Sequence, residues 1–287
     1  MNRCFFVSDL HGDTDKYLKL FKAVRQHCPK ALFLGGDLLP HGLGLLNSVA
    51  RHYGDFINAF LAEELLKIRR ELDRDYPEIF VILGNDDARI EEAAVLEVAG
   101  RGLWHYLHMR TVAFKGYQVY GYAHTPPSPL TLKDWERYDV SRFVDPGCIS
   151  PLEGKLTVPV ARRELQYGTI AQDLEILAGK NNMSEAVFLF HAPPYKTNLD
   201  RAGLDGRKID LVPLDVHVGS IAVQRFIEKR QPLLTLHGHI HESARLTGSW
   251  HDKIGRTVCF TAAHDGPELA LVQFDLDNPE EAVRELL

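Results

Sequence analysis

The chain has 287 residues, of which 45% are hydrophobic and 25% charged, and its formal net charge is -6. These proportions are typical of folded globular proteins, and a chain of this length buries about 75% of its unfolded surface, so a large core forms without disulfides. The longest apolar runs, residues 79–83 and 186–190, have five residues each, far fewer than the roughly 18 of a membrane span. A disordered chain and a membrane-spanning protein are therefore excluded.

The N-terminal residues, the cysteines and the net charge bear on the cellular compartment and the partners of the protein. Only four apolar residues, 4–7, precede the first polar segment, which is too few for a secretory signal, so we expect a cytoplasmic protein. The cysteines are widely spaced, which predicts reduced thiols rather than a zinc pair or a disulfide framework. The acidic balance argues against non-specific nucleic-acid binding and remains compatible with a small phosphorylated substrate. Nothing in the residues predicts an oligomeric state.

Apolar periodicity predicts the secondary structure. Helical spacing and composition predict helices over residues 14–28, 56–72, 88–98 and 218–229, and they assign the charged runs 63–75 and 280–285 to exposed helix faces. Residues 111–123 and 257–276 are predicted as hairpin-type β segments. Short apolar runs followed at once by Gly, Asp, Asn or His predict buried strands at 4–7, 31–34, 79–83, 186–190 and 233–236. Strand–helix–strand order indicates a layered α/β fold with a largely parallel sheet.

Two stretches rich in proline and glycine resist regular assignment. They are residues 124–161 and 192–217, and we interpret them as irregular insertions in a single domain spanning 1–287. Long connections of this kind are often lids or binding loops. A surface insertion without a role is the alternative for each.

Polar residues follow each predicted strand. Asp and His side chains converging at strand ends lose solvation and repel one another unless a cation joins them. Imidazoles with carboxylates and one amide suit Mn, Fe or Zn better than Ca or Mg, and we favour Mn. Six or seven donors exceed the needs of one tetrahedral ion, so two divalent ions sharing a carboxylate are predicted. The candidate donors at the strand ends are Asp9, His11, Asp37, Asn85, Asp86, Asp87, His191, His237, His239 and His241.

This order of motifs resembles the calcineurin-like metallophosphoesterase superfamily. Asp-x-His, Gly-Asp, Gly-Asn-x-Asp, a strand-end His and Gly-His-x-His span residues 9–241, and residues 191–200 and 217–243 are similar to a prokaryotic subgroup of small phosphoesterases. The resemblance implies a four-layer αββα sandwich, with two mixed sheets packed face to face and flanked by helices. It also implies a bridging Asp37, a first metal on Asp9, His11 and His241, and a second on Asn85, His191 and His239.

One position departs from the family pattern. Members usually carry a His after Gly-Asn, which contacts the phosphate and helps to protonate the leaving group, whereas this chain has Asp86. An ionised Asp86 disfavours a monoester dianion more than a diester monoanion. A carboxyl with a raised pKa would instead serve as a proton donor. Asp86, Asp37 and Asn85 are therefore the candidate catalytic residues.

The implied activity is hydrolysis of a phosphodiester by in-line attack of a metal-bridging hydroxide. One alternative is a phosphomonoesterase in which Asp86 or another residue takes the place of the acid His. A second alternative is a metal-binding regulatory or scaffolding protein with weak catalysis. Turnover of any phosphodiester would separate the enzymes from the scaffold.

Further residues have secondary roles in this hypothesis. Asp87 would orient a ligand, or cap a helix that starts at residue 88, or do both. His41 and His124 follow predicted strands and would replace the missing His, with a surface or capping role as the alternative. Lys196 and Arg201 would contact a substrate phosphate, with solvated loop charge as the default.

Overall fold

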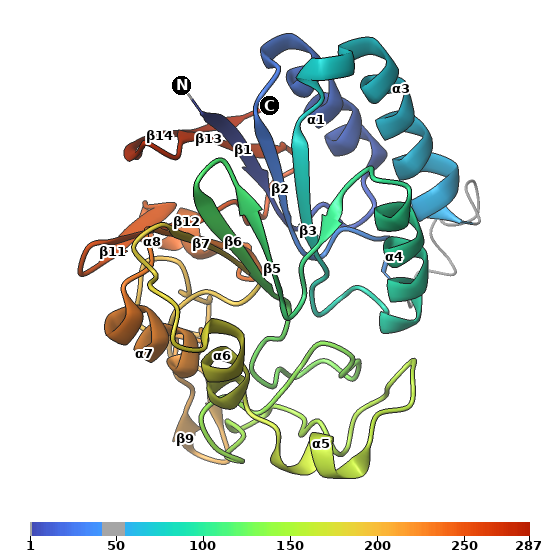
Figure 1. Cartoon of the computed structure of the whole chain (residues 1–287). Helices are drawn as coiled ribbons and strands as arrows, with labels where there is room; N and C mark the ends of the chain where they lie inside the picture. Colours follow the sequence, from blue (N-terminus) through green and yellow to red (C-terminus); the bar gives the residue numbers. More distant parts are fainter. Residues whose placement is uncertain (1, 42–54) are drawn as a thin grey trace.

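The computed structural model describes residues 2–41 and 55–287. Within these residues two mixed six-stranded sheets form (Figure 1). The first has the order β14 (Asn278–Leu286), β13 (Ala270–Asp275), β1 (Arg3–Val7), β2 (Ala31–Gly35), β3 (Glu78–Ile82) and β4 (His105–Tyr106). The second has the order β11 (His251–Ile254), β12 (Thr257–Thr261), β10 (Leu234–His237), β7 (Ala186–Phe190), β6 (Tyr117–Tyr122) and β5 (Arg110–Phe114).

Helices cover the outer faces of both sheets, as Figure 1 shows. The first sheet carries α1 (Thr14–His27), the π-helical η1 (Ile57–Ala62), α3 (Glu63–Leu72), η2 (Asp73–Asp75), η3 (Arg89–Glu91) and α4 (Glu92–Gly100). The second sheet carries α6 (Ile170–Ala178) and α7 (Ile221–Arg230). The shorter α5 (Arg162–Tyr167), α8 (Ser243–Thr247) and the hairpin of β8 (Lys208–Ile209) and β9 (Val212–Pro213) complete the described elements.

Side-chain alternation along the strands explains the layers. On β7, Val187 and Leu189 join the core between the two sheets, whereas Phe188 and Phe190 join a second cluster under α6 and α7. Successive side chains of a strand point to opposite faces, so a fully apolar strand such as β7 is covered on both sides. The predicted αββα sandwich with mixed sheets is therefore confirmed.

The structure confirms most predicted elements and corrects three. Residues 280–285 were expected on a helix face but lie in β14, an edge strand paired with β13, because pairing and burial of alternate residues outweigh helix-forming composition. The segment 257–276 is not a hairpin, since β12 and β13 belong to different sheets. The helix expected at 88–98 starts with the η3 turn and continues as α4 to Gly100.

Aspartate carboxylates hold the two irregular stretches in place. Residues 124–161 form only isolated bridges, and Asp139 in this stretch accepts from the Ser220 hydroxyl and the backbone N–H groups at the start of α7. Residues 192–217 contain the β8–β9 hairpin, and buried Asp200 accepts from His217 and from three backbone N–H groups. No helix in the described ranges is both long and apolar enough to cross a bilayer.

Candidate metal centre

Parallel strand pairing delivers the predicted donors to one edge of the sandwich. β1, β2 and β3 pair in parallel in the first sheet, and β7 and β10 pair in parallel in the second. Their carboxyl ends therefore lie side by side. The loops beyond these ends carry Asp9, His11, Asp37 and Asn85 from the first sheet, and His191, His239 and His241 from the second.

Backbone hydrogen bonds fix the loops that follow β1 and β2. The N–H groups of Asp9, His11 and Gly12 donate to the carbonyls of Gly36, Asp37 and Leu38 at 3.0, 2.8 and 3.0 Å. Four donor residues adopt the left-handed region that non-glycine residues rarely occupy. They are Asp9, His11, Asp37 and His239, with φ of 57°, 46°, 51° and 75°.

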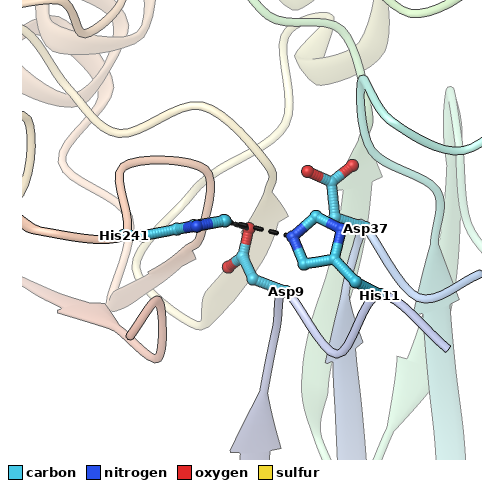
Figure 2. A group of neighbouring side chains, drawn as sticks. All are labelled: Asp9, His11, Asp37 and His241. Atoms are coloured by element: carbon cyan, nitrogen blue, oxygen red, sulfur yellow. Dashed lines mark hydrogen bonds and ion pairs between the residues drawn. The ribbon is translucent and has the colours of Figure 1, made fainter. Parts of the chain in front are cut away.

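The first group of donors consists of Asp9, His11, Asp37 and His241, whose ligand atoms lie within 4.8 Å of one another. Figure 2 shows the imidazoles of His11 and His241 directed toward one another beside the Asp9 carboxylate. Their Nε2 atoms are 3.2 Å apart, and His241 Nε2 is 3.3 Å from Asp9 Oδ1. The ligand atoms of two imidazoles and two carboxylates lie close enough in this group to share one cation.

The second group consists of Asp37, His191 and His239, also within 4.8 Å. His191 Nδ1 donates to the Gly35 carbonyl at 2.8 Å, so Nε2 of the neutral ring carries a lone pair. That Nε2 faces Asn85 Oδ1 at 3.0 Å and Asp37 Oδ2 at 3.2 Å. Three acceptors that face one another need a shared proton or a cation. The donor set thus fits a metal, and Asp37 belongs to both groups.

Burial and mutual charge set the protonation of these residues. Burial alone would raise the pKa of Asp9, but its hydrogen bond to His241 and the nearby imidazoles lower it. Burial opposes protonation of His191, yet the charges of Asp37 and Asp9 outweigh burial and raise its pKa to about 10. Burial and the neighbouring His191 lower the pKa of His239 to about 4. His191 and Asp37 are therefore opposed charges that lie close together away from water.

Two glycines explain how the donors approach so closely. A Cβ at Gly84 would lie 2.3 Å from Asp37 Oδ1 and 2.6 Å from His191 Nε2. A Cβ at Gly36 would lie 2.6 Å from His191 Nδ1. Glycine is needed where a backbone passes this close to a side chain. Sequence reasoning did not assign these glycines a role, although each directly precedes a candidate ligand in the Gly-Asp and Gly-Asn motifs.

Asp87 connects the loops behind the cluster. Its fully buried carboxylate accepts from the N–H groups of Leu38, Leu39 and Gly84, at 3.0, 2.8 and 2.8 Å. The capping alternative is wrong, because the N–H of Arg89 at the start of η3 is bound by Asp134 instead. Asp87 thus contacts the segments that carry Asp37 and Asn85.

Asp86 and His41 lie together at the rim of the cluster. Asp86 Oδ2 is 3.3 Å from His41 Nδ1 and 3.7 Å from His11 Nδ1. The His41 ring stacks on the His11 ring with centroids 4.6 Å apart. The structure therefore places His41, from the loop after β2, beside Asp86, the residue that follows Gly-Asn.

The other predicted substrate contacts lie elsewhere. His124 is buried among the rings of His108, Tyr122 and Trp135, and burial holds its pKa well below the usual range. Lys196 is exposed over the Tyr195 ring. Arg201 binds Asp205 and the Ala202 carbonyl. The contacts of these three predicted residues do not include the candidate ligands.

A model of the calcineurin-like phosphoesterase family matches residues 3–243. The chain belongs to this family. Calcineurin-like phosphoesterases typically bind divalent metals in a dinuclear site, and the donor cluster of this chain occupies the expected edge of the sandwich. A search among curated proteins finds no match.

Solved structures show the same fold at low identity. A Thermus thermophilus protein is 18% identical with a TM-score of 0.55, over 99% of this chain and 98% of that chain. A dimetal phosphatase from Danio rerio is 12% identical with a TM-score of 0.53, over 99% and 95%. The phosphopantetheinyl hydrolase of Mycobacterium tuberculosis is 11% identical with a TM-score of 0.50, over 91% and 89%. These likenesses extend the calcineurin-like fold over nearly the whole chain.

Proposed function

We propose that this chain is a dinuclear metal-dependent phosphoesterase that prefers phosphodiesters. The observation that carries the proposal is the position of Asp37, whose carboxylate belongs to both donor groups at once. A carboxylate shared between two sets of imidazoles is the arrangement that two adjacent divalent ions need. Family membership supports phosphoester chemistry at this site.

The donor groups suggest how two ions would be held. Asp9, His11 and His241 would bind the first ion, Asn85, His191 and His239 the second, and Asp37 both. Mixed imidazole and oxygen donors favour Mn, Fe or Zn, with Mn preferred. When bound, such ions supply a nucleophilic hydroxide at neutral pH and stabilise the oxygens of an in-line phosphoryl displacement.

Residues of the chain hold this arrangement in place. The Asp86 N–H donates to Asp37 Oδ1 at 2.8 Å, which fixes the orientation of the shared carboxylate. Asp87 holds the segments on which Asp37 and Asn85 lie. Preorganised ligands of this kind orient a metal and the substrate bound to it.

The charge at the rim supports the preference for diesters. The Asp86 side chain is one quarter exposed and its Oδ2 lies 3.7 Å from His11 Nδ1, so its carboxyl group lies at the solvent-accessible rim of the site. The partner of Asp86 at the rim is His41. When His41 is protonated, its positive charge balances that of an ionised Asp86, so the pair adds no net positive charge to the site. A rim pair without net positive charge gives no extra attraction for the second negative charge of a monoester dianion, and a phosphodiester monoanion needs none. A small phosphodiester is therefore the proposed substrate.

The test compares two chromogenic esters on protein of known metal content. With Mn added, bis-p-nitrophenyl phosphate should turn over faster than p-nitrophenyl phosphate, and metal analysis should give two ions per chain. Asp37→Ala and His239→Ala should abolish turnover and release metal. The exposed residues Asp75 and His251 provide the matched controls Asp75→Ala and His251→Ala, which should behave as wild type.

Two outcomes would contradict the proposal. Faster hydrolysis of the monoester would overturn the preference for diesters and favour the phosphomonoesterase alternative. Two bound ions without turnover of any ester would favour the regulatory or scaffolding alternative.

A further inference from the structure

An imidazole and a carboxylate form a pair at the entrance to the candidate metal centre. His41 Nδ1 lies 3.3 Å from Asp86 Oδ2, and the two side chains are 51% and 25% exposed. Among the candidate ligands Asp9 and Asp37 are at most 3% exposed and His191 is 0% exposed. The pair thus lies on the accessible side of the site together with His241, whose side chain is 36% exposed, while the carboxylate ligands and His191 are buried.

The backbone before His41 is fixed on two sides. Leu38 and Leu39 donate their N–H groups to buried Asp87. The next residue, Pro40, lies against Gly12, where an added Cβ would be 2.5 Å from Pro40 Cγ. His41 is therefore placed by its own segment, and its position does not depend on the bond to Asp86 alone.

Stacking and pairing fix the ring of His41 as well. The ring lies on His11 with an interplanar angle of 23°, and Nδ1 is directed to Asp86. A ring held at Nδ1 in this way has Nε2 as its remaining polar atom. Within residues 2–41 and 55–287 no hydrogen bond or ion pair involves Nε2 of His41, and a half-exposed imidazole of this kind can bind a ligand at the rim.

We propose that His41 is a catalytic residue that contacts the phosphoryl group of the bound phosphodiester, with Asp86 as its positioning residue. The proposal rests on the phosphoesterase function above and assigns the substrate contact to the loop after β2. It predicts that an imidazole can be moved from position 41 to position 86 without loss of the contact, because both side chains meet at one point of the rim.

Three variants test the proposal against metal-loaded wild type. His41→Ala should lower kcat/KM for bis-p-nitrophenyl phosphate about 100-fold, the usual cost of removing one preorganised contact to a reacting group, with the metal content unchanged. Asp86→Asn should cause a smaller loss of about 10-fold, because the ring keeps its stacking on His11. In the double variant His41→Ala/Asp86→His, activity should recover at least 10-fold over His41→Ala.

A second imidazole–carboxylate pair in the chain provides matched controls. His105 Nε2 lies 2.7 Å from Glu78 Oε2, with side chains 42% and 56% exposed, on the strands β4 and β3. His105→Ala and Glu78→Gln should leave kcat/KM unchanged. Because His41 is half exposed, His41→Ala should also leave the thermal midpoint within about 2 °C of wild type.

A binding measurement separates this proposal from the proposed function. Calorimetric titration of the Mn-loaded protein with inorganic phosphate reports the contact without turnover, and His41→Ala should weaken phosphate binding about 10-fold. If wild type binds phosphate but hydrolyses no ester, the proposed function is contradicted. The His41 contact is then still tested by comparing the phosphate affinities of wild type and His41→Ala.

Two results would overturn the role of His41. One is a His41→Ala variant with wild-type kcat/KM and phosphate affinity. The other is loss of a metal ion from His41→Ala, which would make His41 a ligand, as the proximity of His11, His41 and Asp86 also permits. If Asp86→His does not restore activity to the His41→Ala variant, side chains at positions 41 and 86 do not reach the same part of the substrate.

Discussion

The carboxylate of Asp87 accepts the backbone N–H of Leu39 at 2.8 Å and so joins the loop after β3 to the loop after β2. Both loops carry candidate ligands, Asn85 on one and Asp37 on the other. The relative position of these two ligands therefore depends on a residue that binds neither ion.

Replacing Asp87 tests this connection. Asp87→Ala leaves the buried N–H groups of Leu38, Leu39 and Gly84 without an acceptor, so the free energy of unfolding should fall by about 2–4 kcal/mol. Affinity for Mn should fall about 10-fold, as for other residues that orient ligands. Urea denaturation and metal titration measure the two effects, with exposed Asp75→Ala as the control. Unchanged metal affinity would restrict Asp87 to a structural role.

Gly12→Ala tests the placement of His41. Gly12 has a φ of +69°, and a Cβ there would lie within 2.7 Å of three Pro40 atoms. We expect the free energy of unfolding to fall by about 1–3 kcal/mol and diesterase activity to fall more than metal content. The control is Gly100→Ala in α4, where nothing lies within 4 Å of the added Cβ, and stability should stay equal or rise by up to about 1 kcal/mol. If Gly12→Ala and Gly100→Ala have equal activity, the packing of Pro40 on Gly12 is not needed to position His41.

The buried pair Lys133 and Glu136 should stabilise the stretch 124–161. Both side chains are 0% exposed, and Glu136 also accepts from the N–H and hydroxyl of Ser128. Glu136→Ala strands a buried ammonium, so it should cost about 3–5 kcal/mol in chemical denaturation. The double variant Lys133→Met/Glu136→Gln removes both charges and should cost less than Glu136→Ala alone.

The control for this pair is on the surface. Lys229 on α7 and Glu175 on α6 form an ion pair with side chains 67% and 55% exposed. Glu175→Gln should give no measurable change in stability, because water screens exposed pairs. A double variant at 133 and 136 as unstable as Glu136→Ala would show that packing, rather than the unpaired charge, sets the cost.

His108 should make the fold sensitive to mild acid. Burial, with Arg89, Arg137 and Arg110 nearby, lowers its pKa to about 3 from an ordinary value of 6.5. Below pH 6.5 His108 of the unfolded chain binds a proton that the folded chain excludes, so the contribution of His108 to stability falls as the pH drops from 6.5 toward 3 and is constant above 6.5.

The comparison for His108 is a variant that does not titrate. His108→Gln keeps an acceptor for the Ala123 N–H, which binds His108 Nδ1 at 3.1 Å. As the pH falls below 6.5, the free energy of unfolding of wild type should decrease more steeply than that of His108→Gln, by about 1.4 kcal/mol per pH unit. Denaturation at several pH values measures both slopes, and parallel slopes would contradict a neutral buried His108.

The sequence predicts the strands and their terminal polar residues well, because these signals are local. An apolar run such as residues 186–190 followed by a polar residue is typical of a buried strand in an α/β chain. The convergence of Asp9, Asp37 and His191 then follows from parallel pairing, which places all these ends at one edge.

Other features depend on contacts that the sequence does not display. Residues 280–285 favour a helix by composition, yet pairing with β13 makes them a strand. His41 and His124 had equal standing in the sequence, and only the packing of Pro40 on Gly12 and the burial of His124 under Trp135 and His108 separate them. Tertiary packing decides both cases.

The left-handed backbone at four donor residues has a consequence for protein engineering. Each non-glycine residue with positive φ costs about 1 kcal/mol, and Asp9, His11, Asp37 and His239 all have one. Glycine at such a position relieves the backbone and deletes a donor in the same step. Selection for thermal stability alone would therefore favour substitutions that remove metal donors and inactivate the site. These four positions should be kept unchanged when the chain is engineered for stability.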